Sequence, residues 1–383
     1  MLVELRNEPR DYAWGSTTLL AALQGREASG RPEAEIWFGE HSASPARVGD
    51  GDGPTLAEWR ARRSLTPPAP LPFLVKLLAA DGPLSIQVHP SAEQARAGHA
   101  REQASGIPVD AAERSYRDPH HKPEAIVAVS DTFEALAGLR HPERSRAMLA
   151  TLGSGGAAVA ERLEGPDAAA ALRRTLGWLL SGEAAAEVAA VEAALRDDPA
   201  PEFAADLAAI RRVAGQHPAD PGVVVALLMN RVVLRRGQAL FLPAGALHAY
   251  LSGLGVEVMG PSDNVVRGGL TRKHVDVAEL LRVADTAPGD PPRLVPQTAD
   301  DGMAVLRPPV PDFEVWLRPA DTGPSTVPLH GPAVIVALGP LTVRTASGQI
   351  LPMTAGTAAF ATEDETVLRL AGPGEAVVAQ PGG

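Results

Sequence analysis

The sequence contains one stretch in which apolar and polar residues alternate without exception, and this stretch limits what the chain can fold into. Residues 84–89 read Leu-Ser-Ile-Gln-Val-His. Successive side chains point to opposite faces of a β-strand, so the pattern predicts a strand that carries Ser85, Gln87 and His89 on one face. A strand with a polar inward face indicates a β-barrel whose interior holds a chemical site in place of a core.

Two further segments supply side chains of the same chemical kind. Residues 118–124 read Asp-Pro-His-His-Lys-Pro-Glu. The residue before a proline is kept extended, so Lys122 and Glu124 are expected to share a face. His248 follows an apolar block that is interrupted by a turn at residues 243–245. Together with the glutamine and histidine of the alternating strand, these groups suit Zn²⁺ or a similar divalent ion in an open, catalytic type of site. A lone strand histidine is more often a hydrogen-bonded core residue, so the metal interpretation depends on the three segments meeting.

A later segment is rich in residues that bind or transfer protons. Between residues 257 and 273 lie Glu257, Asp263, Arg267 and Lys273, with glycines that let the backbone approach a ligand closely. Taken alone, the segment is equally typical of a solvated surface loop.

Lysine is rare in this chain. Of the 35 basic residues only three are lysines, namely Lys76, Lys122 and Lys273, and the other 32 are arginines. An ammonium group is compact and titratable and a guanidinium group is neither, so the remaining lysines are expected where that difference matters. Lys122 and Lys273 fall in the segments that carry candidate site residues, and Lys76 lies within a predicted buried strand at residues 71–78.

The pattern of apolar and polar residues along the chain predicts a mainly β fold with an α-helical insertion. Residues 1–140 and 231–295 have strand patterns and carry the candidate site, whereas residues 141–230 are rich in alanine with helical spacing. Residues 296–383 alternate apolar residues with glycine-bearing turns and predict a second β domain without a site. Helices are expected near 167–180, 182–196, 201–214 and 221–230.

Composition excludes several classes of function. The formal net charge of −11 disfavours nucleic-acid binding, and the absence of cysteine excludes disulfides, thiolate nucleophiles and cysteine-ligated metals. No apolar run is long enough to span a bilayer, and the N-terminus has no targeting pattern. We therefore expect a soluble, cytoplasmic protein with no membrane partner.

The motifs, in their order along the chain, resemble the type I mannose-6-phosphate isomerases (phosphomannose isomerases), which are zinc enzymes of the cupin superfamily. Three motifs carry the resemblance most specifically: Gln87-Val-His89, His121-Lys122-Pro-Glu124 and Asp263-Asn-Val-Val-Arg267. Matching stretches cover most of residues 10–140 and 235–277. The helical block and the C-terminal region resemble the family only in their position along the chain and in their general residue pattern.

The resemblance implies a cupin-type jelly-roll barrel, a helical domain and a second, cupin-like C-terminal β domain. It implies one Zn²⁺ per chain, a phosphosugar substrate, a monomer, and interconversion of mannose 6-phosphate and fructose 6-phosphate. The implied metal ligands are Gln87, His89, Glu124 and His248. The residues implied at the sugar site are Lys76, His121, Lys122, Glu257, Asp263 and Arg267.

The isomerisation requires ring opening and proton transfer between C1 and C2 through a cis-enediol. Lys122 or Lys76 is a better base than any arginine, Glu257 and Asp263 are alternative bases, and His121 suits ring opening. Two rival hypotheses are a metal-bearing cupin that binds phosphosugars without turnover, and a non-haem iron oxygenase.

Overall fold

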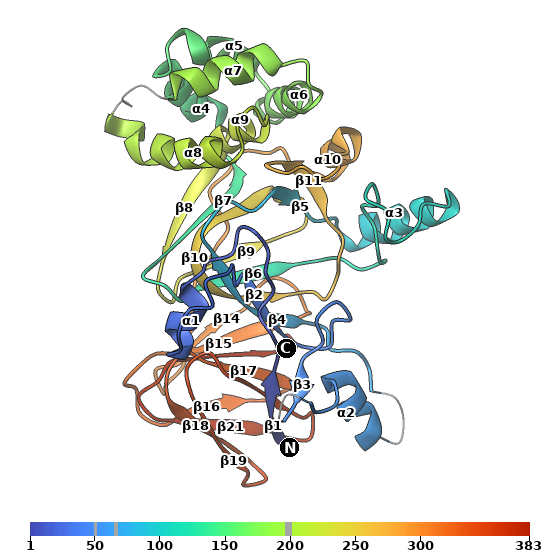
Figure 1. The fold of residues 1–383 in the computed structure, drawn as a ribbon, viewed down its shortest axis with the longest axis vertical. Helices are drawn as coiled ribbons and strands as arrows, with labels where there is room; N and C mark the ends of the chain where they lie inside the picture. The colour runs from blue at the N-terminus through green and yellow to red at the C-terminus, as the bar shows by residue number, and fades with distance from the viewer. Residues whose placement is uncertain (50–51, 65–67, 196–200) are drawn as a thin grey trace.

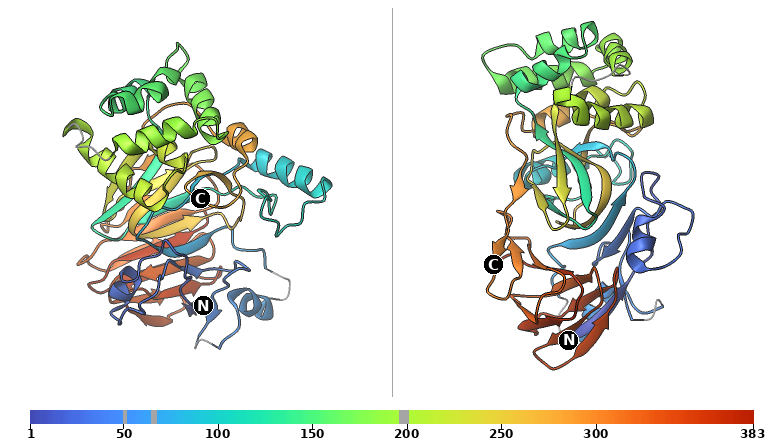
Figure 2. Two further views of the ribbon diagram at one scale, coloured as in Figure 1. Left: turned by 45° about the horizontal axis from the view of Figure 1, so that its top comes forward. Right: turned by 90° about the vertical axis from the view of Figure 1, so that its left-hand side faces the viewer.

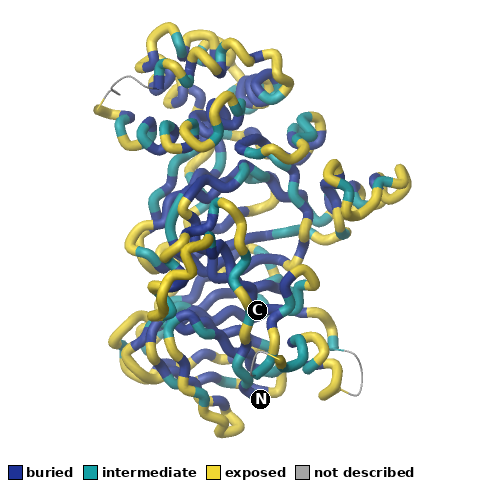
Figure 3. Tube along the Cα trace, viewed as in Figure 1, coloured by how far each residue is buried: buried dark blue, intermediate teal, exposed yellow. Residues whose placement is uncertain are grey.

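The structure, a computed structural model, describes residues 1–49, 52–64, 68–195 and 201–383. Three regions follow one another along the longest axis: a helical region at one end, a β region in the middle and a second β region at the other end (Figure 1). In the described part of the chain, no helix has the length and apolar character needed to cross a membrane. The strands of the middle region are mostly buried, and the exposed residues gather on the outer helices and on loops (Figure 3).

The middle region is a ten-stranded, branched sheet organised around one long strand, β10. The first residues of β10 pair with β5 and β7, and its last residues pair with β4 and β6. The register of β10 with β7 shifts between Tyr250 and Ser252, and at the next residue, Gly253, φ is +116° and a Cβ atom would lie 2.8 Å from the carbonyl oxygen of Thr132. The strands are β2 (Glu35–Phe38), β4 (Leu74–Ala80), β5 (Ile86–Val88), β6 (Glu124–Ala128), β7 (Thr132–Leu139), β8 (Met229–Arg235), β9 (Ala239–Leu242), β10 (His248–Met259), β11 (Val266–Gly269) and β12 (Arg293–Leu294).

These pairings confirm the predicted mainly β fold but refine the expected barrel. Among the described residues the ladders branch from β10 and do not close into a ring. The strand β10 therefore belongs to two sub-sheets, one with β5, β7, β8 and β11 and the other with β2, β4, β6, β9 and β12. The site described below lies between them.

The second β region contains an eight-stranded sheet and a four-stranded sheet that pack on each other through an apolar core. The opposite face of the larger sheet shares a second core with the middle region, in which Leu5, Val334 and Phe360 pack with Ile36 and Val75. The strands are β1 (Leu2–Arg6), β3 (Arg47–Val48), β13 (Gln297–Thr298), β14 (Ala304–Leu306), β15 (Glu314–Arg318), β16 (Ser325–Pro328), β17 (Ala333–Ala337), β18 (Leu341–Thr345), β19 (Ile350–Met353), β20 (Ala358–Ala361), β21 (Val367–Ala371) and β22 (Ala376–Gln380).

Strand β1 lies in the C-terminal sheet, between β20 and β3, although the sequence groups it with residues 1–140. The division of the chain at residues 140, 230 and 295 stays a prediction, with this strand crossing between the predicted domains.

The helical region covers one end of the middle sheet, as two further views show (Figure 2). Its later helices lie where the alanine-rich spacing predicts them, and the Asp220–Pro221 start signal precedes α9 directly. Part of the helix predicted at 182–196 lies outside the described residues. The helices are α4 (Pro142–Ala150), α5 (Ser154–Arg162), α6 (Ala168–Leu180), α7 (Ala185–Ala194), α8 (Ala204–Gln216) and α9 (Gly222–Leu227), with a 3₁₀ turn at Pro201–Phe203. Elsewhere lie α1 (Leu19–Gln24), α2 (Leu56–Arg63), α3 (Ala92–Ala104) and α10 (Val277–Val283).

Candidate metal centre

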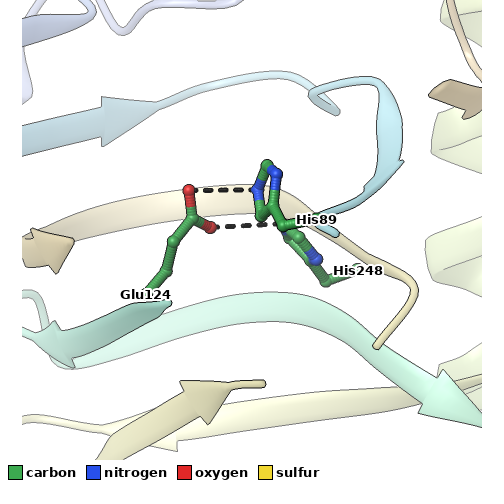
Figure 4. A group of neighbouring side chains, drawn as sticks. All are labelled: His89, Glu124 and His248. Carbon is green, nitrogen blue, oxygen red and sulfur yellow. Dashed lines mark ion pairs between the residues drawn. The ribbon is translucent and has the colours of Figure 1, made fainter. Parts of the chain in front are cut away.

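Three side chains from separate strands converge between the two sub-sheets (Figure 4). His89 follows β5, Glu124 is the first residue of β6, and His248 is the first residue of β10. Nε2 of His89 lies 3.2 Å from Oε1 of Glu124, and Nε2 of His248 lies 3.2 Å from Oε2 of the same carboxylate. The three ligand atoms lie within 4.8 Å of one another, and all three residues are buried.

The hydrogen bonds of the two imidazoles fix which ring nitrogen faces the centre. Nδ1 of His89 lies 2.8 Å from the carbonyl oxygen of Asn264, and Nδ1 of His248 lies 3.0 Å from that of Ala246. A carbonyl oxygen only accepts, so each Nδ1 carries the proton and each Nε2 presents a lone pair. Both Nε2 atoms are buried without a hydrogen-bond partner in the described structure. Two neutral imidazoles and a carboxylate arranged in this way fit a divalent cation of the zinc type.

The β register places Gln87 beside this group. Gln87 on β5 pairs directly with His248 on β10 and, on its other side, with Arg267 on β11. Cross-strand partners project from the same face of a sheet, so the three side chains form a row. Gln87 also lines the adjoining cavity and can supply an amide oxygen to the centre.

A cavity of about 550 Å³ opens next to the three ligands, and all three lysines of the chain line it. Aromatic side chains of Trp14, Trp37 and Tyr250 form part of its wall. The lining residues that carry or accept protons are Glu35, His41, Lys76, Gln87, Lys122, Glu124, His217, Glu257, Asp263, Arg267, Arg272 and Lys273.

One wall of the cavity holds a second row of cross-strand partners. Trp37 pairs with Lys76, and Lys76 pairs with Glu257. The Lys76 ammonium lies 3.1 Å from Oε2 of Glu257, 3.7 Å from Oε1 of Glu35 and 4.6 Å from the centre of the Trp37 ring. Burial lowers the pKa of Lys76, but the two carboxylates outweigh it and raise that pKa above its ordinary value. Burial raises the pKa of Glu257, with Lys76 opposing the shift.

The metal-centre residues are held in the protonation states that a cation requires. Burial lowers the pKa of His89 to about 4, so this imidazole is neutral at physiological pH. Burial alone would raise the pKa of Glu124, but Lys122, whose Nζ lies 3.1 Å from Oε1, and His89 hold it well below its usual range. The centre therefore combines the negative charge of Glu124 with the neutral imidazole of His89.

Another part of the lining is cationic and is called the cationic wall below. Burial lowers the pKa of Arg267, and Arg117 adds to the shift. Burial also lowers the pKa of Lys273, with further contributions from Arg267 and Arg117. Asp263 lies 3.4 Å from Nε2 of His41, which lowers the pKa of the carboxyl group. A group of positive charges without the carboxylates of the Lys76 wall is suited to an anionic ligand.

Known proteins match almost the whole chain in sequence. The model of the phosphomannose isomerase type I catalytic domain matches residues 2–142. The sequence is 34% identical to mannose-6-phosphate isomerase of Salmonella typhimurium and 35% identical to that of Escherichia coli, with 97% of each chain covered in both cases. The chain belongs to the mannose-6-phosphate isomerase family.

Solved structures of this family have the same fold. A mannose 6-phosphate isomerase from Salmonella typhimurium bound to fructose 6-phosphate and zinc superposes with a TM-score of 0.87 at 33% identity, covering 100% of this chain and 99% of that one. A zinc-bound holo structure of mannose 6-phosphate isomerase gives the same TM-score at 32% identity, with the same coverage. The resemblance that the motifs predict is therefore confirmed, together with the cupin-type fold.

The structure gathers most of the residues that the family resemblance implies. The four implied metal ligands meet at one centre or line its cavity, and so do Lys76, Lys122, Glu257, Asp263 and Arg267.

The structure places His121 differently from the sequence prediction. Its Nε2 lies 2.9 Å from Oδ1 of Asp312 in the second β region, and it is not among the residues that line the cavity. The physical reason is the extended backbone before Pro123, because adjacent side chains there point to opposite sides and Lys122 takes the inward one. Asp312 also shows that the second β region contacts a predicted site residue, although the sequence predicts no site in that region.

Sequence reasoning missed two contributions to the cavity. Glu35 faces Lys76 from β2, and its i, i+2 spacing to Trp37 on a strand is the signal that could have found it. Gln216 and His217 reach the cavity from the end of α8, in a block whose residue pattern contains no such signal.

Proposed function

We propose that the chain is a zinc-dependent mannose-6-phosphate isomerase that interconverts mannose 6-phosphate and fructose 6-phosphate. The observation that carries the proposal is the convergence of a two-histidine, one-carboxylate centre with all three lysines of the chain on one cavity. Almost all other basic residues of the chain are arginines. The three lysine amines therefore lie where an aldose–ketose isomerisation requires titratable groups, around this cavity.

We assign the metal to Gln87, His89, Glu124 and His248. Bound there, Zn²⁺ would act as a Lewis acid that stabilises negative charge on the sugar oxygens near C1 and C2. The carbonyl oxygens of Asn264 and Ala246 keep the two imidazoles in the tautomer that this role requires.

We assign the proton transfer between C1 and C2 to Glu257, with Lys76 as its partner. The two candidate carboxylates differ in their surroundings, because the pKa of Glu257 is raised by burial whereas that of Asp263 is lowered by His41. A carboxylate of raised basicity is the better base near neutral pH. The Lys76 ammonium, 3.1 Å from Glu257, is placed to stabilise the carboxylate before it takes the proton and to donate a hydrogen bond to a sugar oxygen.

We assign the phosphate to the cationic wall. Arg267 can bind a phosphate or an enediolate through two parallel hydrogen bonds, and Lys273 adds a compact charge beside it. Placing the anionic end of the sugar there would turn its C1 and C2 toward the metal centre and Glu257, because Arg267 and His248 flank Gln87 in one row.

A coupled assay of the purified protein with mannose 6-phosphate tests this function. We expect turnover that is lost with a chelator and restored by added zinc. Tight binding of fructose 6-phosphate without turnover would instead identify a phosphosugar-binding cupin, and metal-dependent oxygen consumption would identify an oxygenase. Both results would refute the proposal.

We further propose that the chain works as a monomer in the cytoplasm, with a phosphosugar as its only ligand besides the metal and with neither nucleic acid nor membrane as partner. The acidic net charge of −11 supports the absence of a nucleic-acid partner. Light scattering on a sizing column should give a mass near 39.8 kDa.

A further inference from the structure

One carboxylate of the helical region bridges two segments beside the cavity. Asp220 lies just before α9, and its Oδ1 accepts a hydrogen bond of 2.7 Å from the backbone N–H of Gly222. Its Oδ2 accepts a bond of 3.1 Å from the backbone N–H of Thr271, in the loop that follows β11. The first bond is local and lies in the turn that leads into α9, whereas the second ties the helical region to a loop 51 residues later in the chain.

The bridged loop carries side chains of the cavity. Thr271, Arg272 and Lys273 all line it. The hydroxyl oxygen of Thr271 accepts a bond of 3.1 Å from the backbone N–H of Lys273. A chain of two hydrogen bonds therefore runs from Asp220 through Thr271 to the backbone of Lys273, on the cationic wall.

The backbone of this loop is in a conformation that its own residues do not favour. Leu270 has a φ of +54°, and Gly269 before it has a φ of +122°. A non-glycine residue in the left-handed region costs about 1–3 kcal/mol and persists only where its surroundings enforce it. The enforcing contact is close, because a Cβ atom on Gly269 would lie 2.5 Å from the Cα atom of Gly222. The strained turn at residues 269–270 is therefore contacted by Gly222 and followed by the bond from Thr271 to Asp220, and both partners belong to the helical region.

We propose that Asp220 is a positioning residue that holds the Thr271–Lys273 loop over the cavity, so that Lys273 faces the phosphate of the substrate. This inference rests on the proposed function, since it assigns a purpose in that reaction to the helical insertion. The inference predicts that a substitution of Asp220 weakens substrate binding and leaves metal binding unchanged, because Asp220 does not contact the metal centre.

The Asp220→Asn substitution weakens the bridge between the two segments. Asparagine has a single side-chain oxygen, so it can keep only one of the two bonds that the carboxylate accepts. Asp167→Asn is the matched control, because Asp167 caps α6 in the same region by accepting from Ala170 N–H. Thr271→Ala is a second test, since it removes the bond to Lys273 and leaves Asp220 intact.

Steady-state kinetics give the main readout. For Asp220→Asn we expect the KM for fructose 6-phosphate to rise about tenfold, the size of one lost charge-assisted hydrogen bond, with kcat within about threefold and zinc content unchanged. Thr271→Ala should act in the same direction, and Asp167→Asn should leave both constants unchanged. In a Lys273→Met background the Asp220→Asn change should add nothing further, because the two residues act in one chain. A fall in kcat at constant KM, or independent effects in the double variant, would overturn the inference.

Amide hydrogen exchange at Thr271 gives a readout that does not depend on the reaction. We expect the exchange rate of this amide to rise at least about tenfold in Asp220→Asn and to stay unchanged in Asp167→Asn. An unchanged rate in Asp220→Asn would refute the positioning role. If the wild-type protein lacked isomerase activity, the proposed function would fail, and exchange at Thr271 together with titration of inorganic phosphate would still decide the role of Asp220.

Discussion

Replacing Lys76 by methionine would leave two buried carboxylates without the cation that lies between them. The Lys76 ammonium is 3.1 Å from Glu257 and 3.7 Å from Glu35, and all three side chains are at least 92% buried. Methionine preserves much of the volume of the lysine stem, so the change removes the charge with little loss of packing.

The expected loss of stability follows from these distances. Coulomb's law with an effective dielectric constant of about 20 gives roughly 5 kcal/mol for the nearer pair. Removal of one partner from a buried pair is known to cost about 3–5 kcal/mol. We therefore expect the free energy of unfolding of Lys76→Met to fall by about 3–5 kcal/mol at pH 8.

The loss should depend on pH in a definite direction. Without Lys76, burial and Glu124 raise the pKa of Glu257 further. A carboxyl group whose folded pKa lies above its unfolded value costs stability at high pH, and the cost shrinks as the pH falls toward the unfolded value of about 4.3. The difference between variant and wild type should therefore narrow between pH 8 and pH 5.5, by at most about 1.4 kcal/mol per pH unit.

Urea unfolding of the chelator-treated proteins measures this difference without a contribution from metal. The Lys76→Met/Glu257→Gln double variant should recover part of the loss at pH 8, because it removes one of the two uncompensated charges and leaves that of Glu35. Lys273→Met is the control, since Lys273 lies beside arginines instead of carboxylates and should change stability little. A loss below about 1 kcal/mol at pH 8, or one independent of pH, would refute the reasoning.

Three further predictions concern the site. His248→Ala should lose zinc and activity together, and full metal occupancy in elemental analysis would contradict the ligand assignment. Arg267→Ala should lower kcat/KM by orders of magnitude at normal zinc content, and a wild-type rate would remove Arg267 from the site. The metal-free protein should lose up to about 3 kcal/mol of stability as the pH falls from about 6.5 to 4, because the pKa of His89 is lowered to about 4 and the unfolded chain takes up the proton first. The His89→Gln variant should lack that slope in pH-dependent unfolding.

Local patterns in the sequence predicted the metal centre because its ligands obey the two-residue period of strands. Gln87 and His89 were assigned to one face by alternation, and Lys122 and Glu124 by the proline between them. The helical insertion could also be predicted from the sequence, because alanine-rich helical spacing and the Asp220–Pro221 signal are local features. The family resemblance added the pairing of these segments with His248.

Features that depend on pairing between strands far apart in the sequence could not be predicted from local patterns. The place of β1 in the C-terminal sheet follows from its register with Ala358–Ala361, and no local pattern encodes that partner. The raised pKa of Lys76 has the same origin, because Glu35 and Glu257 reach it from two other strands. The sequence offers Lys76 as one choice of base, whereas the carboxylates around it raise its pKa.

The strand β10 supplies both His248 at its beginning and Glu257 nine residues later, in two different sub-sheets. Inserting or deleting one residue near its start would turn His248 outward, and the same change in its second half would turn Glu257 away from Lys76. Along β10, evolution toward other substrates can therefore exchange side chains but cannot change the number of residues in the strand. Length variation has to be accommodated in the loops and in the helical insertion instead.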